Sequence, residues 1–327
     1  MRNPQPWHRA TLRAHRDLTP SVREFELSPE DGALLPWTPG SHLNVQVLLD
    51  SGLETRSYSL VGLHRDGDAA YRIAVKRVAA SRGGSRHLWS LPVGAKLLIG
   101  EPANHFELPL AAPQYLLVAG GIGVTPIVGM AQQLAARGAD VRMLYAARGA
   151  TEFALRDELQ AVLGERLRTF ASDAGQRIAF DAEIAALHPQ AVLLACGPLT
   201  MLDAVRAAWA RTPRPATHLR FETFGSGGAA ANEAFWVRLP RHGIELQVPP
   251  ERTLLDVLND HGIDTLYDCR RGECGLCAVD VIEAHGRIDH RDVFFSTREK
   301  QEAKRLCACV SRVSGGGVVL DSAYRPD

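Results

Sequence analysis

Five of the six cysteines of this 327-residue chain lie near its C-terminal end, and their spacing limits how that part can fold. Three of the six lie in the stretch DCRRGECGLC, residues 268–277, as Cys269, Cys274 and Cys277. Four residues separate the first two, two separate the next pair, and Cys307 follows after a further 29 residues. This pattern predicts a tight loop that presents three thiols to one point, with a fourth thiol from a later strand.

Clustered cysteines can form disulfides, zinc sites or iron–sulfur clusters, and spacing separates these alternatives. The pattern is that of plant-type 2Fe–2S clusters, in which one loop supplies three thiolates. Zinc sites usually contain paired Cys-x2-Cys units, whereas here the first gap is longer and the fourth cysteine stands alone. Gly272 and Gly275 suit a loop that curls around a cluster, because glycine tolerates positive φ angles. The predicted cluster ligands are Cys269, Cys274, Cys277 and Cys307.

Cys309 is the alternative fourth ligand, since it lies two residues beyond Cys307 in the segment LCACVSRV. In a regular strand both side chains would lie on the same face. We expect Cys307 to bind the cluster and Cys309 to be a buried free thiol. Asp268 and Glu273 place negative charge next to the loop cysteines, which is expected to lower the reduction potential of a cluster.

Composition narrows the class of protein further. The chain has 37 lysine and arginine residues and 37 aspartate and glutamate residues, so its formal net charge is zero. This balance gives no electrostatic case for a nucleic acid or an anionic membrane as partner. The sequence has no run of about 18 apolar residues, so no membrane span is expected. The N-terminal MRNPQPWHRATLR lacks the apolar segment of a signal peptide. We therefore expect a cytoplasmic protein, in which disulfides are rare.

Three segments that differ in their pattern of expected strands and helices indicate a multidomain chain. Residues 1–110 contain short β-rich runs separated by glycine and proline, which predicts an antiparallel β-barrel. Residues 111–226 alternate strand and helix patterns, which predicts an α/β domain with a parallel sheet. Residues 227–234 have the small-residue composition of a linker. Residues 235–327 combine strands, short helices and the cysteine loop in an α+β, β-grasp-like domain.

The segment RSYSL, residues 56–60, resembles the Arg-x-Tyr-Ser flavin motif of the ferredoxin–NADP reductase superfamily. The forked guanidinium of Arg56 suits a flavin phosphate. Tyr58 can lie against the isoalloxazine ring, and Ser59 can form a hydrogen bond near its reactive nitrogen. A barrel strand with an arginine and a tyrosine on one face is nevertheless common, so this motif needs support from elsewhere in the chain.

The stretch VKRVAASRGGSRHLWSL gives that support, because a glycine pair precedes a short helical pattern. Ser85 is predicted to be the N-cap of this helix, whose free amides can cradle a phosphate. The alternative is an ordinary glycine-rich loop. The predicted flavin-site residues are Arg56, Ser57, Tyr58, Ser59, Ala74, Lys76, Gly83, Gly84 and Ser85.

Two further motifs predict a nucleotide site. The segment GGIGVTP, residues 120–126, follows an apolar strand and opens a helix, so its glycines allow a pyrophosphate to approach the helix N-terminus. Thr125 and Pro126 suit the first helical turn. The segment ACGP, residues 195–198, ends a later strand, where Cys196 could also be an ordinary buried cysteine. The predicted nucleotide-site residues are Gly120, Gly121, Gly123, Thr125, Pro126, Cys196, Gly197 and Pro198.

With CRRGECGLC, DHRD and LCACVSR, residues 235–327 resemble the ferredoxin domain of phthalate dioxygenase reductase-type proteins, and the domain order extends this resemblance over nearly the whole chain. The resemblance implies FMN rather than FAD, and NADH rather than NADPH. It places Cys196 beside the nicotinamide and Phe224, in FETF, over the flavin ring. Arg148 is the candidate cation for a 2′-phosphate, should NADPH bind. The predicted catalytic residues are Ser59, Cys196 and Phe224.

The resemblance also implies a path for electrons. A hydride carries two electrons and a 2Fe–2S cluster takes one, so a flavin must mediate between them. The implied function is a reductase that passes electrons from NADH through FMN and the cluster to a separate terminal oxygenase, favoured to be a Rieske-type non-heme iron oxygenase or demethylase. Two alternatives are a cytochrome P450 as acceptor and a non-enzymatic redox sensor.

Overall fold

The computed structural model describes residues 6–32, 34–49, 52–78, 83–224 and 232–321. The chain divides into two compact units, Met1–Glu222 and Thr223–Asp327. Three sheets, one in each segment of distinct texture, confirm the predicted fold class. The predicted domain boundaries stay predictions. Residues 227–231 of the predicted linker lie outside the described residues.

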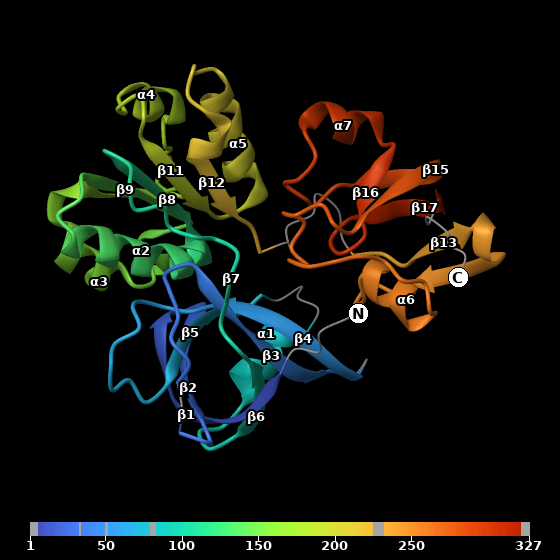
Figure 1. The fold of residues 1–327 in the computed structure, drawn as a ribbon, viewed down its shortest axis with the longest axis horizontal. Coiled ribbons are helices and arrows are strands. Elements are labelled where there is room, and N and C mark those ends of the chain that lie inside the picture. Colours follow the sequence, from blue (N-terminus) through green and yellow to red (C-terminus); the bar gives the residue numbers. More distant parts are fainter. Residues whose placement is uncertain (1–5, 33, 50–51, 79–82, 225–231, 322–327) are drawn as a thin grey trace. The chain divides into compact units, whose positions relative to one another are not determined.

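A closed antiparallel barrel forms the first part of unit Met1–Glu222 (Figure 1). Its strand order is β4-β3-β6-β1-β2-β5, with the short β7 paired to β3. A bridge between Leu60 and Ile73 closes the barrel, and the Val61 N–H donates to the Arg72 carbonyl at 2.9 Å. The elements are β1 (Trp7–Thr19), β2 (Val22–Pro29), β3 (Ser41–Leu49), β4 (Gly52–Ser59), β5 (Tyr71–Lys76), α1 (Gly84–Ser90), β6 (Lys96–Gly100) and β7 (Ala103–Asn104).

A five-stranded parallel sheet forms the rest of this unit, in the order β10-β9-β8-β11-β12. Helices α2 and α3 contact one another on one side, and α4 and α5 contact one another on the other (Figure 1). The strand order reverses between β8 and β11, and the crevice at such a reversal is where open α/β sheets bind ligands. The strands are β8 (Tyr115–Gly120), β9 (Val141–Ala147), β10 (Leu167–Ala171), β11 (Val192–Cys196) and β12 (Leu219–Glu222).

The helices of this sheet follow its strands in chain order. The α-helices are α2 (Val124–Ala136), α3 (Arg156–Leu163), α4 (Phe180–Ala185) and α5 (Leu199–Ala210), and the 3-10 turns are η1 (Gly121–Gly123), η2 (Ala150–Glu152), η3 (Gly164–Arg166) and η4 (Ala216–His218). Helix α2 is apolar and mostly buried, because it packs on β8, β9 and β11. No helix in the described part of the chain is long and apolar enough to cross a membrane.

Unit Thr223–Asp327 is built on a mixed sheet in the order β14-β13-β17-β15-β16. Strands β13 and β17 are parallel and the other pairs are antiparallel. Helix α6 buries Leu254, Leu255 and Leu258 in the core of this unit. The elements are β13 (Phe235–Leu239), η5 (Pro240–His242), β14 (Ile244–Val248), α6 (Leu254–Asp260), β15 (Ala278–Asp289), α7 (Thr297–Glu302), β16 (Arg305–Cys307) and β17 (Arg312–Asp321).

The prediction of one continuous strand over LCACVSRV is wrong. Strand β16 ends at Cys307, the chain turns over residues 308–310, and β17 begins at Arg312. The Cys307 carbonyl accepts hydrogen bonds from the Val310 and Ser311 amides at 3.2 and 2.9 Å, which closes the turn. Cys307 and Cys309 therefore do not share one face of a regular strand.

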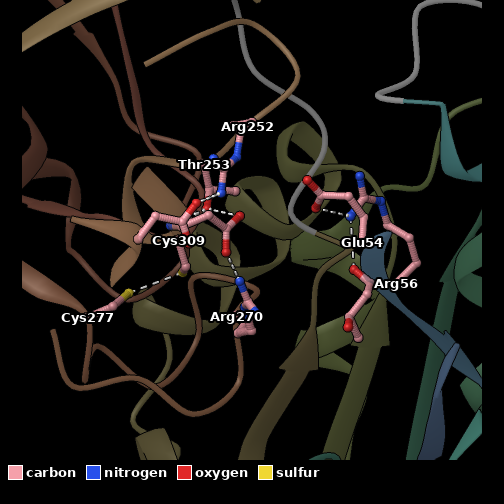
Figure 2. Close-up of polar contacts among 10 residues, drawn as sticks. Glu54, Arg56, Arg252, Thr253, Arg270, Cys277 and Cys309 are labelled. Atoms are coloured by element: carbon pink, nitrogen blue, oxygen red, sulfur yellow. Dashed lines mark hydrogen bonds and ion pairs between the residues drawn. The ribbon is translucent and has the colours of Figure 1, made fainter. Parts of the chain in front are cut away.

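Helix α6 offers a test of the C-terminal fold. The Thr253 hydroxyl accepts the Asp256 N–H at 3.1 Å as the N-cap of α6 (Figure 2). We expect Thr253→Ala to destabilise this helix by about 1 kcal/mol and to speed amide exchange in α6 by about fivefold, as measured by hydrogen-exchange mass spectrometry. Thr253→Ser keeps the hydroxyl and is the control. Equal exchange in all three proteins would contradict the assigned cap.

Candidate functional site

Arg56 lies on β4 with most of its side chain covered. Its Nη1 donates to Glu54 Oε2 at 3.2 Å and to the Thr55 carbonyl at 2.9 Å (Figure 2). Its Nη2 is buried and has no hydrogen-bond partner among the described residues. A buried guanidinium nitrogen without a partner is costly, so this atom fits an oxygen of a bound anion such as a phosphate.

Ser59 and Tyr58 end the same strand. Ser59 is 4% exposed, and within the described structure its hydroxyl has no partner, so it can bind a polar atom of a ligand. Tyr58 packs against the barrel core, and burial raises the pKa of its hydroxyl. Ser57 points to the other face of the strand, where its hydroxyl donates to Asn44 Oδ1 at 2.5 Å. The structure thus leaves one buried atom without a partner on each of Arg56 and Ser59 in the described barrel and gives Ser57 a partner within the barrel.

The glycine pair also reaches this site, although its helix starts earlier than predicted. The N-cap of α1 is Gly83, with φ of 93°, so the prediction of Ser85 as the N-cap is wrong. Ser85 lies inside the first turn, where its hydroxyl accepts the Val78 N–H at 3.3 Å. A Cβ on Gly84 would lie 2.9 Å from Cγ of Arg56, so the start of α1 packs directly on that arginine.

Ala74 and Lys76 lie on β5 and alternate with Ile73 and Val75, whose side chains fill the barrel core. The side chains of Ala74 and Lys76 therefore face outward from the barrel, on the same side as Arg72. Strand β5 contacts η1, the first turn of the predicted pyrophosphate loop. The outer face of β5 thus adjoins both the predicted flavin site and the predicted nucleotide site.

Three glycines pack together at the carboxyl ends of β8 and β11. A Cβ on Gly123 would lie 2.2 Å from the Cys196 carbonyl oxygen, and one on Gly120 would lie 2.6 Å from Cδ of Pro198. Gly197 also packs on the Gly120 backbone, since its Cβ would lie 3.0 Å from Gly120 Cα. The structure therefore brings the two predicted nucleotide motifs together at the reversal point of the sheet, where the backbone can approach a ligand.

The remaining predicted residues of this site differ in exposure. Thr125 is buried and its hydroxyl donates to the Ile122 carbonyl at 3.0 Å, so it stabilises the turn. Pro126 is buried in the first turn of α2, and Cys196 is fully buried. Pro198 is exposed at the end of β11. The burial of Cys196 fits packing and orientation and does not fit a nucleophile.

The carboxyl ends of β9 and β10 carry a residue that sequence analysis missed. Asp173 follows β10, and its Oδ2 would lie 2.5 Å from a Cβ on Gly149. The Asp173 N–H donates to the carbonyl of exposed Arg148 at 2.8 Å. A carboxylate therefore accompanies the arginine that was the candidate for a 2′-phosphate. Its position depends on the pairing of β9 with β10, which no local motif reveals.

The cysteine loop presents backbone amides to the first predicted ligand. The N–H groups of Arg271, Glu273 and Cys274 each lie 3.4 Å from Cys269 Sγ. Burial raises the pKa of the Cys269 thiol to about 11, and these amides oppose the rise because they stabilise the thiolate. Gly272 has φ of 75°, and a Cβ there would lie 2.7 Å from Val310. This amide-lined loop fits a thiolate-bound cluster.

Cys277 lies beside both candidates for the fourth ligand. Its Sγ is 3.1 Å from Cys309 Sγ (Figure 2). Hydrogen bonds from Cys307 and Cys309 lower the pKa of the Cys277 thiol to about 3. All six cysteines of the chain are free, and Cys307 and Cys309 are both almost fully buried.

The two candidates differ in what else surrounds them. The hydrogen bond to Cys277 and burial raise the pKa of Cys309. A hydrogen bond from the Gly272 amide to the Cys309 sulfur opposes that rise. The hydrogen bond to Cys277 and burial likewise raise the pKa of Cys307, and the negative charge of Asp292 adds to that rise. Cys309 thus has one amide of the cysteine loop, that of Gly272, beside its sulfur, whereas Cys307 has the buried Asp292 carboxylate nearby. The geometry favours Cys309 over the predicted Cys307.

Glu273 connects the cysteine loop to the segment that contains Phe224. Its Oε1 accepts the Thr223 N–H at 2.5 Å, and its Oε2 lies 3.8 Å from Nε of Arg271. Burial raises the pKa of Glu273, and Arg271 opposes that rise. Phe224 is half-buried at the end of the described segment. Asp268, by contrast, is exposed.

Asp292, in the DHRD segment, is a structural residue of the loop that was not predicted as such. It is fully buried, and its Oδ2 accepts the Phe295 N–H at 2.8 Å. Burial alone would raise the pKa of Asp292, but hydrogen bonds from His290 and Phe295 lower it overall. A Cβ on Gly272 would lie 2.8 Å from Asp292 Cα, so the DHRD segment packs directly against the cysteine loop.

Comparison with known proteins agrees with this arrangement of sites. Residues 237–314 match the 2Fe-2S iron-sulfur cluster binding domain, and residues 117–207 match the oxidoreductase NAD-binding domain. The chain is 39% identical over 321 residues to a putative toluene-4-sulfonate monooxygenase system reductase subunit of Comamonas testosteroni, which covers 95% of this chain and 98% of that protein.

Two solved structures are also similar. Phthalate dioxygenase reductase, described as a modular structure for electron transfer from pyridine nucleotides to [2Fe-2S], has a TM-score of 0.77 at 32% identity, over 96% of this chain and 98% of that chain. An intact type IV self-sufficient cytochrome P450 monooxygenase has a TM-score of 0.67 at 33% identity. That match covers 96% of this chain and 41% of the P450 chain.

The contact between Gly123 and Cys196 can be tested by adding one methyl group. Gly123→Ala would force its Cβ into the Cys196 carbonyl oxygen. We expect this substitution to weaken nucleotide binding by about tenfold, or about 1.4 kcal/mol, and to leave the flavin content unchanged because the barrel is not altered. Isothermal titration with NAD⁺ measures the affinity. Gly138→Ala is the control: its Cβ would meet no atom, and its φ of 68° adds backbone strain away from the nucleotide site. Equal affinities in the two variants would contradict the assigned contact.

Proposed function

Because the chain belongs to the phthalate dioxygenase reductase family of oxygenase reductases, we propose that it is an NADH-dependent oxidoreductase that passes electrons through FMN and a 2Fe–2S cluster to a separate terminal oxygenase. The observation that carries this proposal is the pair of buried atoms without partners in the described barrel, Arg56 Nη2 and Ser59 Oγ. They lie on one strand, and Arg56 packs against the glycine-rich start of α1, as a flavin phosphate would require.

Bound FMN would accept the two electrons of a hydride and release them singly. For this, Arg56 would hold the FMN phosphate with the start of α1 beside it. The Ser59 hydroxyl would orient the flavin ring by a hydrogen bond. Ala74 and Lys76, on the outer face of β5, would complete the wall of the flavin site toward η1. The role of Phe224 at the flavin ring, which the family resemblance implies, stays a prediction.

The dinucleotide would lie across the carboxyl ends of the parallel strands. Gly120, Gly121 and Gly123 would admit the pyrophosphate, and Cys196 to Pro198 would adjoin the nicotinamide. The adenosine half then extends the opposite way along the sheet edge, over β9 and β10. A carboxylate at Asp173 would accept a ribose hydroxyl and repel a 2′-phosphate, which supports NADH over NADPH.

For the cluster we propose Cys269, Cys274, Cys277 and Cys309 as ligands, with Cys309 in place of Cys307. Support comes from the 3.1 Å contact between Cys277 and Cys309 and from the Gly272 amide beside Cys309. The turn at residues 308–310 brings Cys309 to the loop and leaves Cys307 beside Asp292. Backbone amides around Cys269 would stabilise negative charge on the reduced cluster.

The electron acceptor is proposed to be a Rieske-type non-heme iron oxygenase, a separate protein, in a cytoplasmic system. The toluene-4-sulfonate relative is named as the reductase subunit of a monooxygenase system, which supports a separate oxygenase. The six free cysteines agree with a reducing compartment. A P450 acceptor is the second candidate, because a self-sufficient P450 monooxygenase contains a similar segment.

Anaerobic titration with NADH tests the proposed electron path. Two electrons on the flavin and one on the cluster require about 1.5 NADH per chain. We expect flavin absorbance to bleach and a reduced-cluster signal to appear in the electron paramagnetic resonance spectrum. Absence of both changes would refute the proposal. Turnover with a purified Rieske oxygenase and with a P450 then separates the two candidate acceptors.

The fourth cluster ligand can be identified by matched serine substitutions. We expect Cys309→Ser to lose most of its iron and acid-labile sulfide, because a ligand to the cluster is replaced. Cys307→Ser should retain about two irons per chain, with a spectrum close to that of the wild type. Metal analysis and visible absorbance measure both. The opposite result, with cluster loss in Cys307→Ser alone, would assign Cys307 instead.

A further inference from the structure

Four charged residues connect the barrel to the parallel-sheet part of unit Met1–Glu222, and we call them the ion cluster. They are Arg16 on β1, Glu24 on β2, Arg72 on β5 and Glu158 on α3. Arg72 Nη2 donates to Glu158 Oε1 at 2.8 Å and to Glu24 Oε2 at 2.7 Å. Arg16 Nη2 reaches Glu158 Oε1 at 3.4 Å, and its Nε donates to Glu24 Oε1 at 3.1 Å.

Glu158 is the member that the parallel-sheet part contributes, so it alone makes the cluster a connection. Glu24 is almost fully buried and keeps both arginines within the barrel. Removal of the Glu158 charge therefore leaves no buried arginine without a carboxylate, which is the usual cause of severe destabilisation. Glu158 can thus be replaced without disruption of the barrel itself.

The strand that carries Arg72 also carries the wall of the flavin site. Arg72, Ala74 and Lys76 are alternate residues of β5, so their side chains point to the same face. Ala74 pairs with Glu24 across the β2–β5 ladder. The Arg72 carbonyl accepts the Val61 N–H at 2.9 Å, two residues beyond Ser59. A displacement of the Arg72 side chain would therefore shift the backbone of β5 and of Val61, which carries the residues of the flavin site.

A second contact joins the same two parts close to this strand. A Cβ on Gly129 of α2 would lie 2.3 Å from the Gly62 carbonyl oxygen, so the backbones of helix and loop are in direct contact there. Gly62 lies three residues after Ser59, and α2 continues directly from the glycine turn of η1. This contact limits how close the flavin and nucleotide sites can come.

The interface between these contacts is hollow. A cavity of about 330 Å³ is lined by Trp37, Val61, Arg72, Gln132 and Glu158. Close-packed apolar side chains resist displacement, whereas a cavity does not. The ion cluster thus supplies the attraction across this part of the interface, and the Gly62–Gly129 contact supplies the opposing stop.

From this arrangement we infer that Glu158 is a positioning residue for hydride transfer. Through Arg72 it holds the flavin-bearing face of β5 at a fixed distance from the nucleotide site on η1 and β11. The inference rests on the proposed NADH and FMN sites. Hydride transfer is sensitive to such spacing, because a misplacement of about 1 Å can cost about a hundredfold in rate.

Glu158→Gln in the full chain loaded with FMN and cluster tests this role. Stopped-flow reduction of the flavin by NADH gives a limiting rate and an apparent dissociation constant from one series. We expect the limiting rate to fall by about tenfold, with the dissociation constant and the flavin content within about twofold of the wild type. Long-wavelength charge-transfer absorbance between nicotinamide and flavin should weaken in parallel, since it reports the spacing of the two rings.

Asp157→Asn is the matched control. Asp157 is exposed and lies in the same first turn of α3, so both variants remove one negative charge from the same helix N-terminus. Hydrogen-exchange mass spectrometry should show faster exchange in β5 and α3 for Glu158→Gln than for Asp157→Asn. Equal reduction rates and equal exchange in the two variants would overturn the inference.

The wild-type protein separates this inference from the proposed function. If NADH fails to bleach the flavin of the wild type, the proposed function is wrong. If the wild type is reduced and Glu158→Gln matches Asp157→Asn, the positioning role alone is wrong. Gly129→Ala supplies an independent check, because its Cβ would push α2 away from Gly62, and it should lower the limiting rate as well.

Discussion

Direct contact of backbone with backbone is the constraint on which the candidate sites depend. A Cβ on Gly123 would collide with the Cys196 carbonyl, one on Gly129 would collide with Gly62, and one on Gly272 would collide with Asp292. Each of these glycines stands where two segments distant in sequence must meet without a side chain between them. The positions of the nucleotide turn, the loop after the flavin strand and the cysteine loop are therefore fixed mainly by main-chain packing. Functional side chains such as Arg56 and Ser59 extend from a backbone whose position these contacts determine.

The cations near the sites are largely neutralised by carboxylates of the same part of the chain. Arg56 has Glu54, Arg271 has Glu273, and Arg270 forms an ion pair with Asp256 (Figure 2). What a ligand meets is then the residual hydrogen-bonding capacity of each group and not a bare charge. At Arg56 that capacity is the buried Nη2, which is directional and short in range. This explains how a chain of zero net charge can present an anion site without attracting polyanions in general.

The sequence was sufficient for the architecture and for residues that belong to local motifs. Strand patterns predicted the barrel and the parallel sheet, and glycine turns predicted where the strands end, because both follow from neighbours in the chain. Prediction failed where long-range packing decides. Cys307 and Cys309 look equivalent in a strand pattern, but a turn at residues 308–310 separates them. The predicted N-cap of α1 was two residues too late, because the cap is Gly83 and Gly84 already packs against Arg56. Asp173 has no local signal at all.

Residues that set distances are harder to predict than residues that bind. A binding motif must be continuous enough to surround its ligand, so it leaves a local pattern such as RSYSL or GGIGVTP. A distance between two sites depends on contacts such as that of Arg72 with Glu158, which are separated by 86 residues in the chain. Neither residue differs by type or spacing from an ordinary surface ion pair, and such pairs usually contribute little to stability. Their influence should therefore be sought in the rate of transfer between the sites, where a small displacement is costly, before it is sought in the stability of the fold.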